Sequence, residues 1–381
     1  MMARKGKRIL FMQTQAENAG AQEISRLLGE GLSARGHEVH HVFFYRKTDS
    51  FDDSKNTLIC CEKRPSNPIA FWRFYKGLIN STKELAPDIV FTFQHFGNVL
   101  GAPAARLAGC STVVANQVSA RETINPVLRV IDWVWGVSGV YPRITVNSDA
   151  LLRDYENFPA LYTRKLLQIP HGFEDKTSSL SRKKARGLHG LPEGVPLIGT
   201  VARLNEAKQI DCAIRLLKQD PKWHLVIAGQ GPDAERLKSI ADQLGVAKRI
   251  TFLGELAQDA IGSVLAALDV FVFPSRAETF GLAAVEACQA GIPVIANDLD
   301  VLREVLAVKG KPCADFVDVK NTDDFAKAVR HVLQDKVHAQ AMTKRGVLLK
   351  EKYSLSAMVD AYEAMVLGKD LSAWQVNGDS S

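Results

Sequence analysis

The sequence has no hydrophobic run long enough to cross a membrane. None of its segments supplies the ~20 consecutive apolar residues that a spanning helix needs, although 46% of its 381 residues are hydrophobic. The residues up to Arg8 are basic, and the apolar stretch 9–12 that follows is too short for the core of a signal peptide. We therefore expect no secretion and a cytoplasmic location.

Paired cysteine motifs, short repeats and low-complexity tracts are also absent. The six cysteines show no C-x-x-C spacing and mostly lie in apolar surroundings, at positions 60, 61, 110, 212, 288 and 313. This pattern favours reduced core thiols over a disulfide or zinc framework. The net charge of +6 is modest. It indicates no nucleic-acid partner, but it is compatible with attraction to anionic lipid or to phosphorylated substrates.

The sequence does contain a regular alternation of strand and helix patterns, which is typical of parallel sheets built from βαβ units. The strand series restarts after a polar, basic segment at 178–196, which we interpret as a linker. We predict an α/β fold of two Rossmann-like domains facing across a cleft, at 1–180 and 181–355. A C-terminal helix and tail at 356–381 is expected to pack back toward the first domain. The expected strands are 8–12, 38–45, 88–93, 112–115 and 143–146, then 197–201, 224–228, 250–253, 270–273, 293–296 and 314–317.

One strand–turn–helix pattern carries two glutamates eight positions apart. An apolar strand at 270–273 leads through a turn into a helix opening near Gly281, with Glu278 before the opening and Glu286 after it. A helix N-terminus offers free N–H groups and a partial positive charge to phosphate. Here Phe280, Gly281 and Leu282 would supply those amides. In a wholly helical interval the carboxylates would stand about 12 Å apart along the axis, which suits a long ligand held at both ends.

Two cations follow the strand at 197–201. Parallel sheets place ligands at the carboxyl ends of their strands, so Arg203 and Lys208 are expected to project into the same site. Fixed cations stabilise the negative charge that develops on a departing diphosphate. The alternative is that Arg203 and Lys208 are ordinary surface cations. Glu278 and Glu286 would then be solvated charges on an ordinary strand–turn–helix.

Three further positions follow strand ends. Gly229 opens a G-x-G turn, which also permits a weaker interpretation as a dinucleotide fingerprint. Gly20 stands at an expected helix start after the first strand, where glycine lets a phosphate or an acceptor approach the backbone. His95 follows the third strand and could hydrogen-bond a sugar hydroxyl or an acceptor, although a lone histidine is often a packed or capping residue.

These motifs together resemble retaining glycosyltransferases of family 4, which have the GT-B fold. Glu278-x-Phe280-Gly281 with Glu286 is similar to the family's E-x7-E motif, and Arg203 with Lys208 to its R-L-x3-K element. The turn at Gly229 resembles its G-x-G-P element, and the loop at Gly20 its G-G-A element with the first glycine replaced. The resemblance implies that Glu278 contacts the sugar, that Glu286 holds the ribose hydroxyls, and that the two cations neutralise the donor phosphates.

The sequence also departs from the family pattern. Asp300 and Val301 stand where the family commonly has two glycines, and His171 and Glu174 replace the more usual Asn and Asp. No D-x-D motif follows a strand to hold a metal, and Asp298 with Asp300 lies in the wrong loop. We expect no metal and no cofactor, with a nucleoside-diphosphate sugar as the donor substrate.

The resemblance implies transfer of a hexose-type sugar to a hydroxyl of a glycan or lipid-linked glycan, in surface polysaccharide or lipopolysaccharide biosynthesis. The first domain would bind the acceptor and the second the donor. A nucleotide-sugar isomerase of the same architecture is one alternative, and a dinucleotide-dependent oxidoreductase is another. Segments 70–79 and 124–141 interleave aromatic and basic residues. They are candidates for peripheral contact with an anionic membrane at its inner face, with burial of the aromatics as the alternative.

Overall fold

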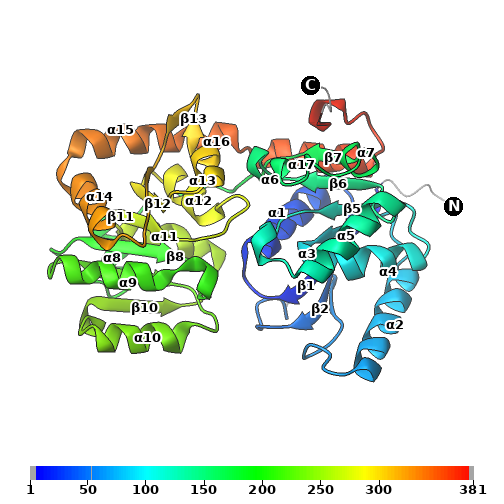
Figure 1. The fold of residues 1–381 in the computed structure, drawn as a ribbon, viewed down its shortest axis with the longest axis horizontal. Helices are drawn as coiled ribbons and strands as arrows, with labels where there is room; N and C mark the ends of the chain where they lie inside the picture. Colours follow the sequence, from blue (N-terminus) through cyan, green and yellow to red (C-terminus); the bar gives the residue numbers. More distant parts are fainter. Residues whose placement is uncertain (1–5, 53, 377–381) are drawn as a thin grey trace. The chain divides into compact units, whose positions relative to one another are not determined.

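The computed structural model describes residues 6–52 and 54–376, and its residues form two compact units (Figure 1). The first unit contains the residues up to Gly172 together with those from Tyr353 onward. The second unit is Phe173–Lys352. The structure thus divides the chain at Gly172 and Lys352, where the sequence patterns placed the divisions after residues 180 and 355.

The first unit is a seven-stranded parallel sheet in the order β3-β2-β1-β4-β5-β6-β7. Its strands are β1 (Arg8–Ala16), β2 (Glu38–Arg46), β3 (Thr57–Ile59), β4 (Ile89–Phe93), β5 (Val113–Asn116), β6 (Arg143–Val146) and β7 (Leu166–Gln168). Its helices are α1 (Gly20–Ala34), α2 (Pro68–Leu85), α3 (Gln94–Phe96), α4 (Ala102–Leu107), α5 (Pro126–Ser138), α6 (Asp149–Arg153), α7 (Ala160–Thr163) and α17 (Leu355–Val366). The five predicted strands are confirmed, and β3 and β7 are additional.

The second unit has a six-stranded parallel sheet in the order β10-β9-β8-β11-β12-β15 and a two-stranded sheet of β13 and β14. Its strands are β8 (Leu197–Val201), β9 (His224–Ala228), β10 (Ile250–Gly254), β11 (Val270–Phe273), β12 (Val294–Asn297), β13 (Ala307–Val308), β14 (Lys311–Pro312) and β15 (Asp315–Val317). Its helices are α8 (Arg182–Leu188), α9 (Ile210–Leu216), α10 (Ala234–Gln243), α11 (Ile261–Ala267), α12 (Leu282–Gln289), α13 (Asp300–Val305), α14 (Thr322–Gln334), α15 (Lys336–Val347) and α16 (Leu349–Lys352).

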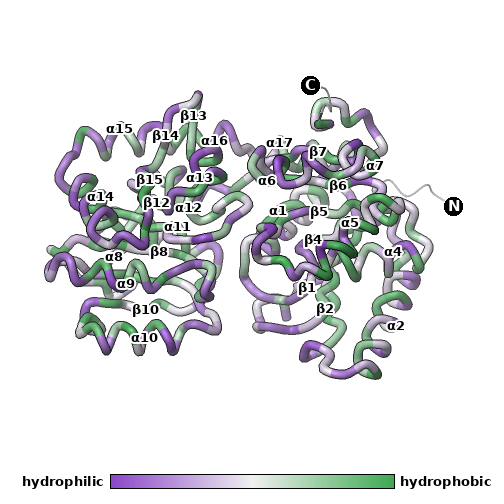
Figure 2. The backbone as a smooth tube through the Cα atoms, viewed as in Figure 1, coloured by the Kyte–Doolittle hydropathy of each residue, from purple (hydrophilic) through white to green (hydrophobic). Residues whose placement is uncertain are grey.

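The central strands are buried on both faces. Every residue of β11 and of β4 is buried, which explains why both strands are written as continuous apolar runs rather than as alternating patterns. The helices that cover the sheets are amphipathic, and hydrophobic and hydrophilic residues alternate along α10 (Figure 2). Apolar side chains of α9 and α14 pack with those of β8, β9 and β11 into one core.

The strand order reverses at one place in each sheet. In the second unit β8 connects to β9 on one side, while β11 and β12 lie on its other side. The reversal in the second unit therefore lies between β8 and β11. In the first unit it lies between β1 and β4. Loops diverge where the order reverses, and doubly wound sheets bind ligands at the carboxyl ends of the strands at this place.

The interpretation of 178–196 as a linker is wrong. Residues 182–188 form α8, which packs on α11 inside the second unit. The Arg186 side chain is buried, donates to the Ala267 carbonyl at 3.1 Å and pairs with Asp269 at 2.7 Å. Asp269 also accepts from the backbone N–H of Leu197 at 2.8 Å. The basic composition therefore reflects a buried ion pair as well as solvated charges.

The described part of the chain contains no helix that is both long enough and apolar enough to span a membrane. All six cysteines are free, and four of them are buried, as expected for core thiols.

Candidate functional site

The carboxyl ends of β8 and β11 bring Lys208 and Glu278 together. Lys208 Nζ lies 2.5 Å from Glu278 Oε1, and the two side chains are 24% and 11% exposed. The same ammonium group lies 5.4 Å from the centre of the Phe273 ring. The sequence predicted both residues separately, and the structure joins them as a partly buried ion pair across 70 positions of sequence.

The backbone around Lys208 is held by its own loop and by the β11 loop. Asn205 caps the short turn at 206–208, accepting the Lys208 N–H at 3.2 Å on its side chain. Gln209 follows in the left-handed region, with φ of 46°. The Arg276 N–H donates to the Ala207 carbonyl at 2.9 Å. This bond joins the loop carrying Lys208 to the loop carrying Glu278.

Gly281 is required where α12 begins. Its φ of +85° lies in the left-handed region, and a Cβ there would stand 2.5 Å from Leu302 Cδ2 and 3.4 Å from Phe273 Cε1. The first turn that follows has N–H groups without intrahelical acceptors. Phe280 is buried, with its ring 5.7 Å from that of Phe173. Its side chain therefore anchors the turn, and only its backbone amide could serve a ligand.

Glu286 lies on α12 and Glu278 on the loop before it, so the interval between them is not wholly helical. The separation of about 12 Å that a continuous helix would give does not apply. Glu286 is half-buried and stands four residues beyond the helix start at Leu282, or about 6 Å further along the axis. The amino end of the helix therefore separates the two carboxylates.

Gly229 and Gly231 have a structural explanation. A Cβ on Gly229 would lie 1.9 Å from the Ala202 carbonyl oxygen, and one on Gly231 would lie 2.2 Å from that of Leu204. The β9 turn thus packs backbone to backbone against the loop that carries Arg203. Leu204 N–H donates to the Gln230 carbonyl at 2.9 Å in the same contact. This packing accounts for the glycines without a dinucleotide, and a ligand role for Gly229 stays a prediction.

Arg203 lies two residues beyond β8 and is half-buried. The loops after β8 and β11 and the start of α12 therefore carry Arg203, Lys208, Glu278, Glu286 and the amides near Gly281. All of these positions belong to the second unit. Gly20 and His95 belong to the first unit, so they form a separate group.

His95 lies two residues beyond β4 and is 6% exposed. Burial, with a smaller contribution from the charge of Arg129, lowers its pKa to about 4, so the ring is neutral near pH 7. Neither ring nitrogen has a hydrogen-bond partner within the described residues. The preceding residue, Gln94, has a φ of 64° and accepts the Thr14 N–H on its side chain at 3.4 Å.

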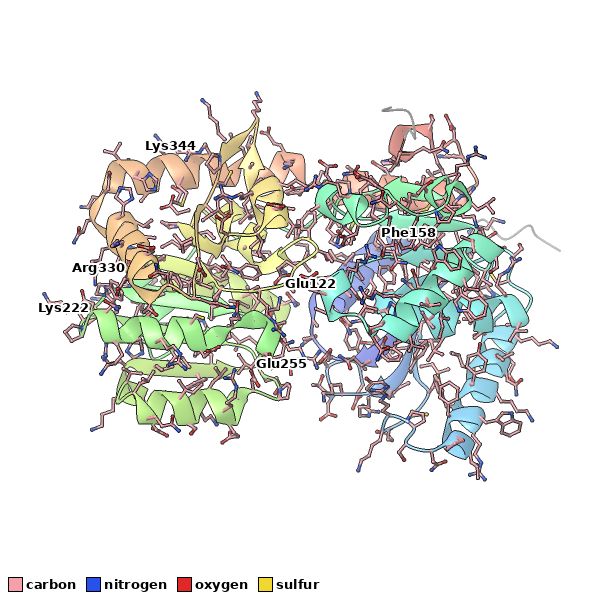
Figure 3. All side chains as sticks on the ribbon, in the orientation of Figure 1. Glu122, Phe158, Lys222, Glu255, Arg330 and Lys344 are labelled. Atoms are coloured by element: carbon pink, nitrogen blue, oxygen red, sulfur yellow. The ribbon has the colours of Figure 1, made fainter. Side chains whose placement is uncertain are left out.

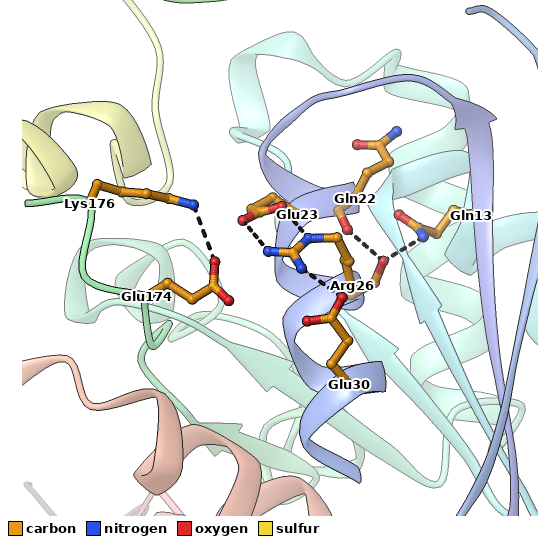
Figure 4. Close-up of polar contacts among 8 residues, drawn as sticks. Gln13, Gln22, Glu23, Arg26, Glu30, Glu174 and Lys176 are labelled. Atoms are coloured by element: carbon orange, nitrogen blue, oxygen red, sulfur yellow. Dashed lines mark hydrogen bonds and ion pairs between the residues drawn. The ribbon is translucent and has the colours of Figure 1, made fainter. Parts of the chain in front are cut away.

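Gly20 is the first residue of α1, after Ala19 in extended conformation. Gln13 on β1 donates to Ser25 Oγ at 2.7 Å, which fixes the start of the helix against the strand (Figure 4). Arg26 pairs with Glu23 at 2.8 Å and with Glu30 at 2.7 Å, and these bonds raise its pKa. The cation on α1 is therefore already neutralised by its own helix.

Sequence reasoning missed buried polar atoms at these strand ends. In the described part of the chain, several such atoms lack a hydrogen-bond partner: Gln13 Oε1, Thr14 Oγ1 and Gln22 Oε1 in the first unit, and Thr200 Oγ1, Gln209 Oε1 and Ser275 Oγ in the second. Buried polar atoms are nearly always paired in folded proteins. Gln13 and Thr14 lie in β1, Thr200 lies in β8, and Ser275 lies two residues after β11. Within each unit, such atoms therefore occur in or just after the strands that flank the reversal of strand order. Their only sequence signal was a polar residue in or beside an apolar strand.

His171 and Glu174, which depart from the family pattern, both have side-chain partners. Asn147 Nδ2 lies 2.9 Å from His171 Nε2, and burial lowers the His171 pKa to about 3. A neutral His171 can accept this hydrogen bond. Glu174 pairs with Lys176 at 3.2 Å (Figure 4). In the loop after β12, Asp298 pairs with Arg303 at 2.5 Å.

Residues 181–347, less than half of the chain, match the family model described as Glycosyl transferases group 1. Among curated proteins, the O-antigen biosynthesis glycosyltransferase WclY of Escherichia coli is 28% identical over 197 residues, which cover 51% of this chain and 53% of the relative. The chain spans about half the length of the curated relatives it matches.

Two solved structures resemble nearly the whole chain. HepE of Anabaena, solved in complex with UDP and glucose, has a TM-score of 0.81 at 18% identity and covers 95% of this chain and 100% of its own. WaaG, a glycosyltransferase involved in lipopolysaccharide biosynthesis, has a TM-score of 0.77 at 17% identity, with coverages of 94% and 100%. At these identities the likeness concerns the fold, and the predicted GT-B fold of two Rossmann-like domains is confirmed.

Proposed function

We propose that the protein is a glycosyltransferase that moves a hexose-type sugar from a nucleoside-diphosphate sugar to a hydroxyl of a glycan or lipid-linked glycan. The observation that carries the proposal is the Lys208–Glu278 pair beside the start of α12. Both lie inside the segment that matches the group 1 model. The E. coli relative named for O-antigen biosynthesis supports a role in surface polysaccharide or lipopolysaccharide assembly.

The ion pair suggests how the donor engages the site. Lys208 Nζ donates to Glu278 Oε1 at 2.5 Å in the structure. A diphosphate offers more negative charge than one carboxylate, and charge-assisted hydrogen bonds to it are strong. The bound donor would therefore draw Lys208 toward its phosphates, with Arg203 beside it. Glu278 would then be released to accept hydrogen bonds from sugar hydroxyls.

The helix start and Glu286 would complete the donor site. The amides at Phe280, Gly281 and Leu282 supply donors and the positive end of the α12 dipole to the diphosphate. Glu286 stands further along the helix, where a carboxylate can accept bonds from two ribose hydroxyls. Two cations and a helix start provide the electrostatic stabilisation that a metal would otherwise give to the leaving group.

We infer a retaining reaction. The bond between the anomeric carbon and the phosphate oxygen breaks, and a bond to the acceptor oxygen forms on the same face of the sugar. The acceptor proton passes to the departing phosphate oxygen, so no separate general base is needed. His95, neutral because burial keeps its pKa near 4, would hydrogen-bond a hydroxyl rather than donate a full proton. Gly20 would let the ligand approach the backbone of the first unit.

Peripheral membrane contact is part of the proposal. On α2, Ile69 and Trp72 are 66% and 62% exposed, and Lys76 lies 5.1 Å from the Trp72 ring. On α5, Val127 and Val130 are 66% and 60% exposed. Exposed apolar and aromatic side chains beside cations are the features that interfacial helices use. They would hold the enzyme at the inner face of the cytoplasmic membrane, near a lipid-linked acceptor.

The test is transfer of labelled sugar from a nucleoside-diphosphate sugar to a glycan acceptor. We expect Glu286→Ala to abolish transfer while its circular dichroism and melting temperature stay those of the wild type, because Glu286 is half-buried on the surface of α12. Undiminished transfer by Glu286→Ala would refute the assigned role. Conversion of the nucleotide sugar without any acceptor would instead indicate an isomerase.

A further inference from the structure

A second cluster of ligating side chains lies in the second unit, away from the donor site. Asp315 on β15, His331 on α14 and His338 on α15 each offer one ligand atom, and these atoms all lie within 4.8 Å of one another. His338 Nε2 is 3.0 Å from both carboxylate oxygens of Asp315. The rings of His331 and His338 have their centres 4.5 Å apart.

The backbone fixes both histidines. Helices α14 and α15 are separated by Asp335 alone, which ends the first helix and caps the second. The Asp335 N–H donates to the His331 carbonyl at 2.8 Å, and Asp335 Oδ1 accepts the His338 N–H at 2.9 Å. The corner therefore holds the two imidazoles on one side of the bend, which is drawn in orange in Figure 1. Arg330 and Lys344 mark the same two helices in Figure 3.

From this geometry we propose that Asp315, His331 and His338 bind a zinc ion. Two imidazole nitrogens and one carboxylate oxygen are ligands that zinc takes at about 2.0–2.2 Å, with water in the fourth position. Tetrahedral bonds of that length place ligand atoms about 3.3 Å apart. The His338–Asp315 separation needs to widen by only a few tenths of an ångström. The His331 side chain is 53% exposed and lies 3.6 Å from Asp335 Oδ2, so it gives up only this long, exposed contact when it turns toward the ion.

The cluster lies at the amino ends of the strands, whereas the donor site lies at their carboxyl ends. Asp315 pairs with Ile295, near the amino end of β12, whereas Asn297 at the carboxyl end of that strand bonds to the Ser275 carbonyl beside the donor loops. The α14 helix runs back from its cap at Asn321 to that amino edge. The ion would therefore clamp the α14–α15 corner to the edge strand and take no part in sugar transfer. The expectation that the donor site needs no metal is unaffected.

The test is zinc binding by the full chain after removal of metals with a chelator. We expect one equivalent of Zn²⁺ to bind and to raise the melting temperature, because only a ligand that favours the native state does so. Co²⁺ in the same site should give the visible absorption of a tetrahedral complex. His331→Ala should remove both signals, and because the side chain is exposed we expect this variant to fold as the wild type does. His189→Ala, a histidine of the same unit bonded to Ser263 at 2.8 Å, should keep them.

Asp315→Asn gives a second variant that preserves the size of the side chain and a hydrogen bond to His338 while removing the negative charge. We expect it to weaken zinc binding by at least about tenfold. Absence of stoichiometric binding to the wild type would overturn the proposal. Zinc affinity equal to that of the wild type in both His331→Ala and Asp315→Asn would also overturn it. Transfer activity is not a readout, so failure of the proposed enzymatic function leaves this test intact.

Discussion

The carboxyl edges of the two sheets present different chemistry. In the second unit the edge carries charge, with Lys208 and Glu278 paired at 2.5 Å beside a helix start. In the first unit the corresponding edge carries mostly neutral groups. His95 and the side-chain oxygens of Gln13 and Thr14 lack hydrogen-bond partners among the described residues, and the buried Glu17 follows β1 directly. Cations suit phosphate, whereas neutral donors and acceptors suit hydroxyls. Under the proposed function, the edge of the second unit would take the anionic donor and the edge of the first unit the hydroxyl-rich acceptor.

The largest effect should come from removing a cation from the carboxyl edge of the second sheet. Lys208→Ala removes a cation from the leaving group and leaves Glu278, only 11% exposed, without this partner. We expect kcat/KM for transfer to fall about 10²–10³-fold, as when one preorganised donor to a developing anion is removed. Lys238→Ala serves as the matched control, because its side chain is 52% exposed and pairs with Glu235 on its own helix. A fall below about threefold in Lys208→Ala would contradict the assignment.

A smaller effect, on the free energy of unfolding, should follow from a substitution at the start of α12 that removes no charge. Gly281→Ala combines a φ of +85° with a contact of 2.5 Å between the new Cβ and Leu302, and should lower the free energy of unfolding by about 2–3 kcal/mol. Gly291→Ala has a similar φ of +75°, but its Cβ meets only Val347, at 3.8 Å. It should cost about 1 kcal/mol. Urea unfolding of both variants measures the difference, and equal losses would show that crowding at α12 is unimportant.

The smallest effect concerns the neutral groups of the first unit. Burial lowers the pKa of His41 to about 4, with a smaller contribution from His40, and that of His171 to about 3, from 6.5 in the unfolded chain. Because the fold holds these rings neutral, their contribution to stability is complete above about pH 6.5 and is lost as the pH falls toward 4.

We expect His41→Leu to lose less stability than the wild type between pH 7.5 and pH 4.5, by on the order of 2 kcal/mol. Unfolding in urea at the two pH values gives this difference, and each protein's own value at pH 7.5 is its reference. An identical pH dependence in both proteins would show that His41 does not titrate abnormally.

Much of the fold could be predicted from the sequence because the buried parallel strands are continuous apolar runs. The strands that were missed are short and give no such signal. β3 is only partly buried, β14 has two residues, both exposed, and β7 has three. Helix α8 was hidden in a basic segment, because composition does not distinguish the buried Arg186 from solvated lysines.

The sequence predicted which residues belong to the candidate site, but not which of their side chains touch. Residues after strand ends were identified because parallel topology gathers them at one edge. The sequence could not show that Lys208 and Glu278 touch, because 70 residues separate them. Nor could it show that Gly229 is needed for the close approach of the Ala202 carbonyl. Thr200 and Ser275 were missed because a single polar residue in or beside a strand has no periodic pattern.

The most direct test of the charged edge is the melting temperature of the purified protein with each member of a panel of nucleoside-diphosphate sugars. At a concentration of about 100 times Kd, the matching donor should stabilise the wild type by about 2.7 kcal/mol. Glu286→Ala and Lys208→Ala should lose most of that gain. Stabilisation by no member of the panel, or equal stabilisation of both variants and the wild type, would contradict a nucleotide-sugar site at the carboxyl ends of β8 and β11.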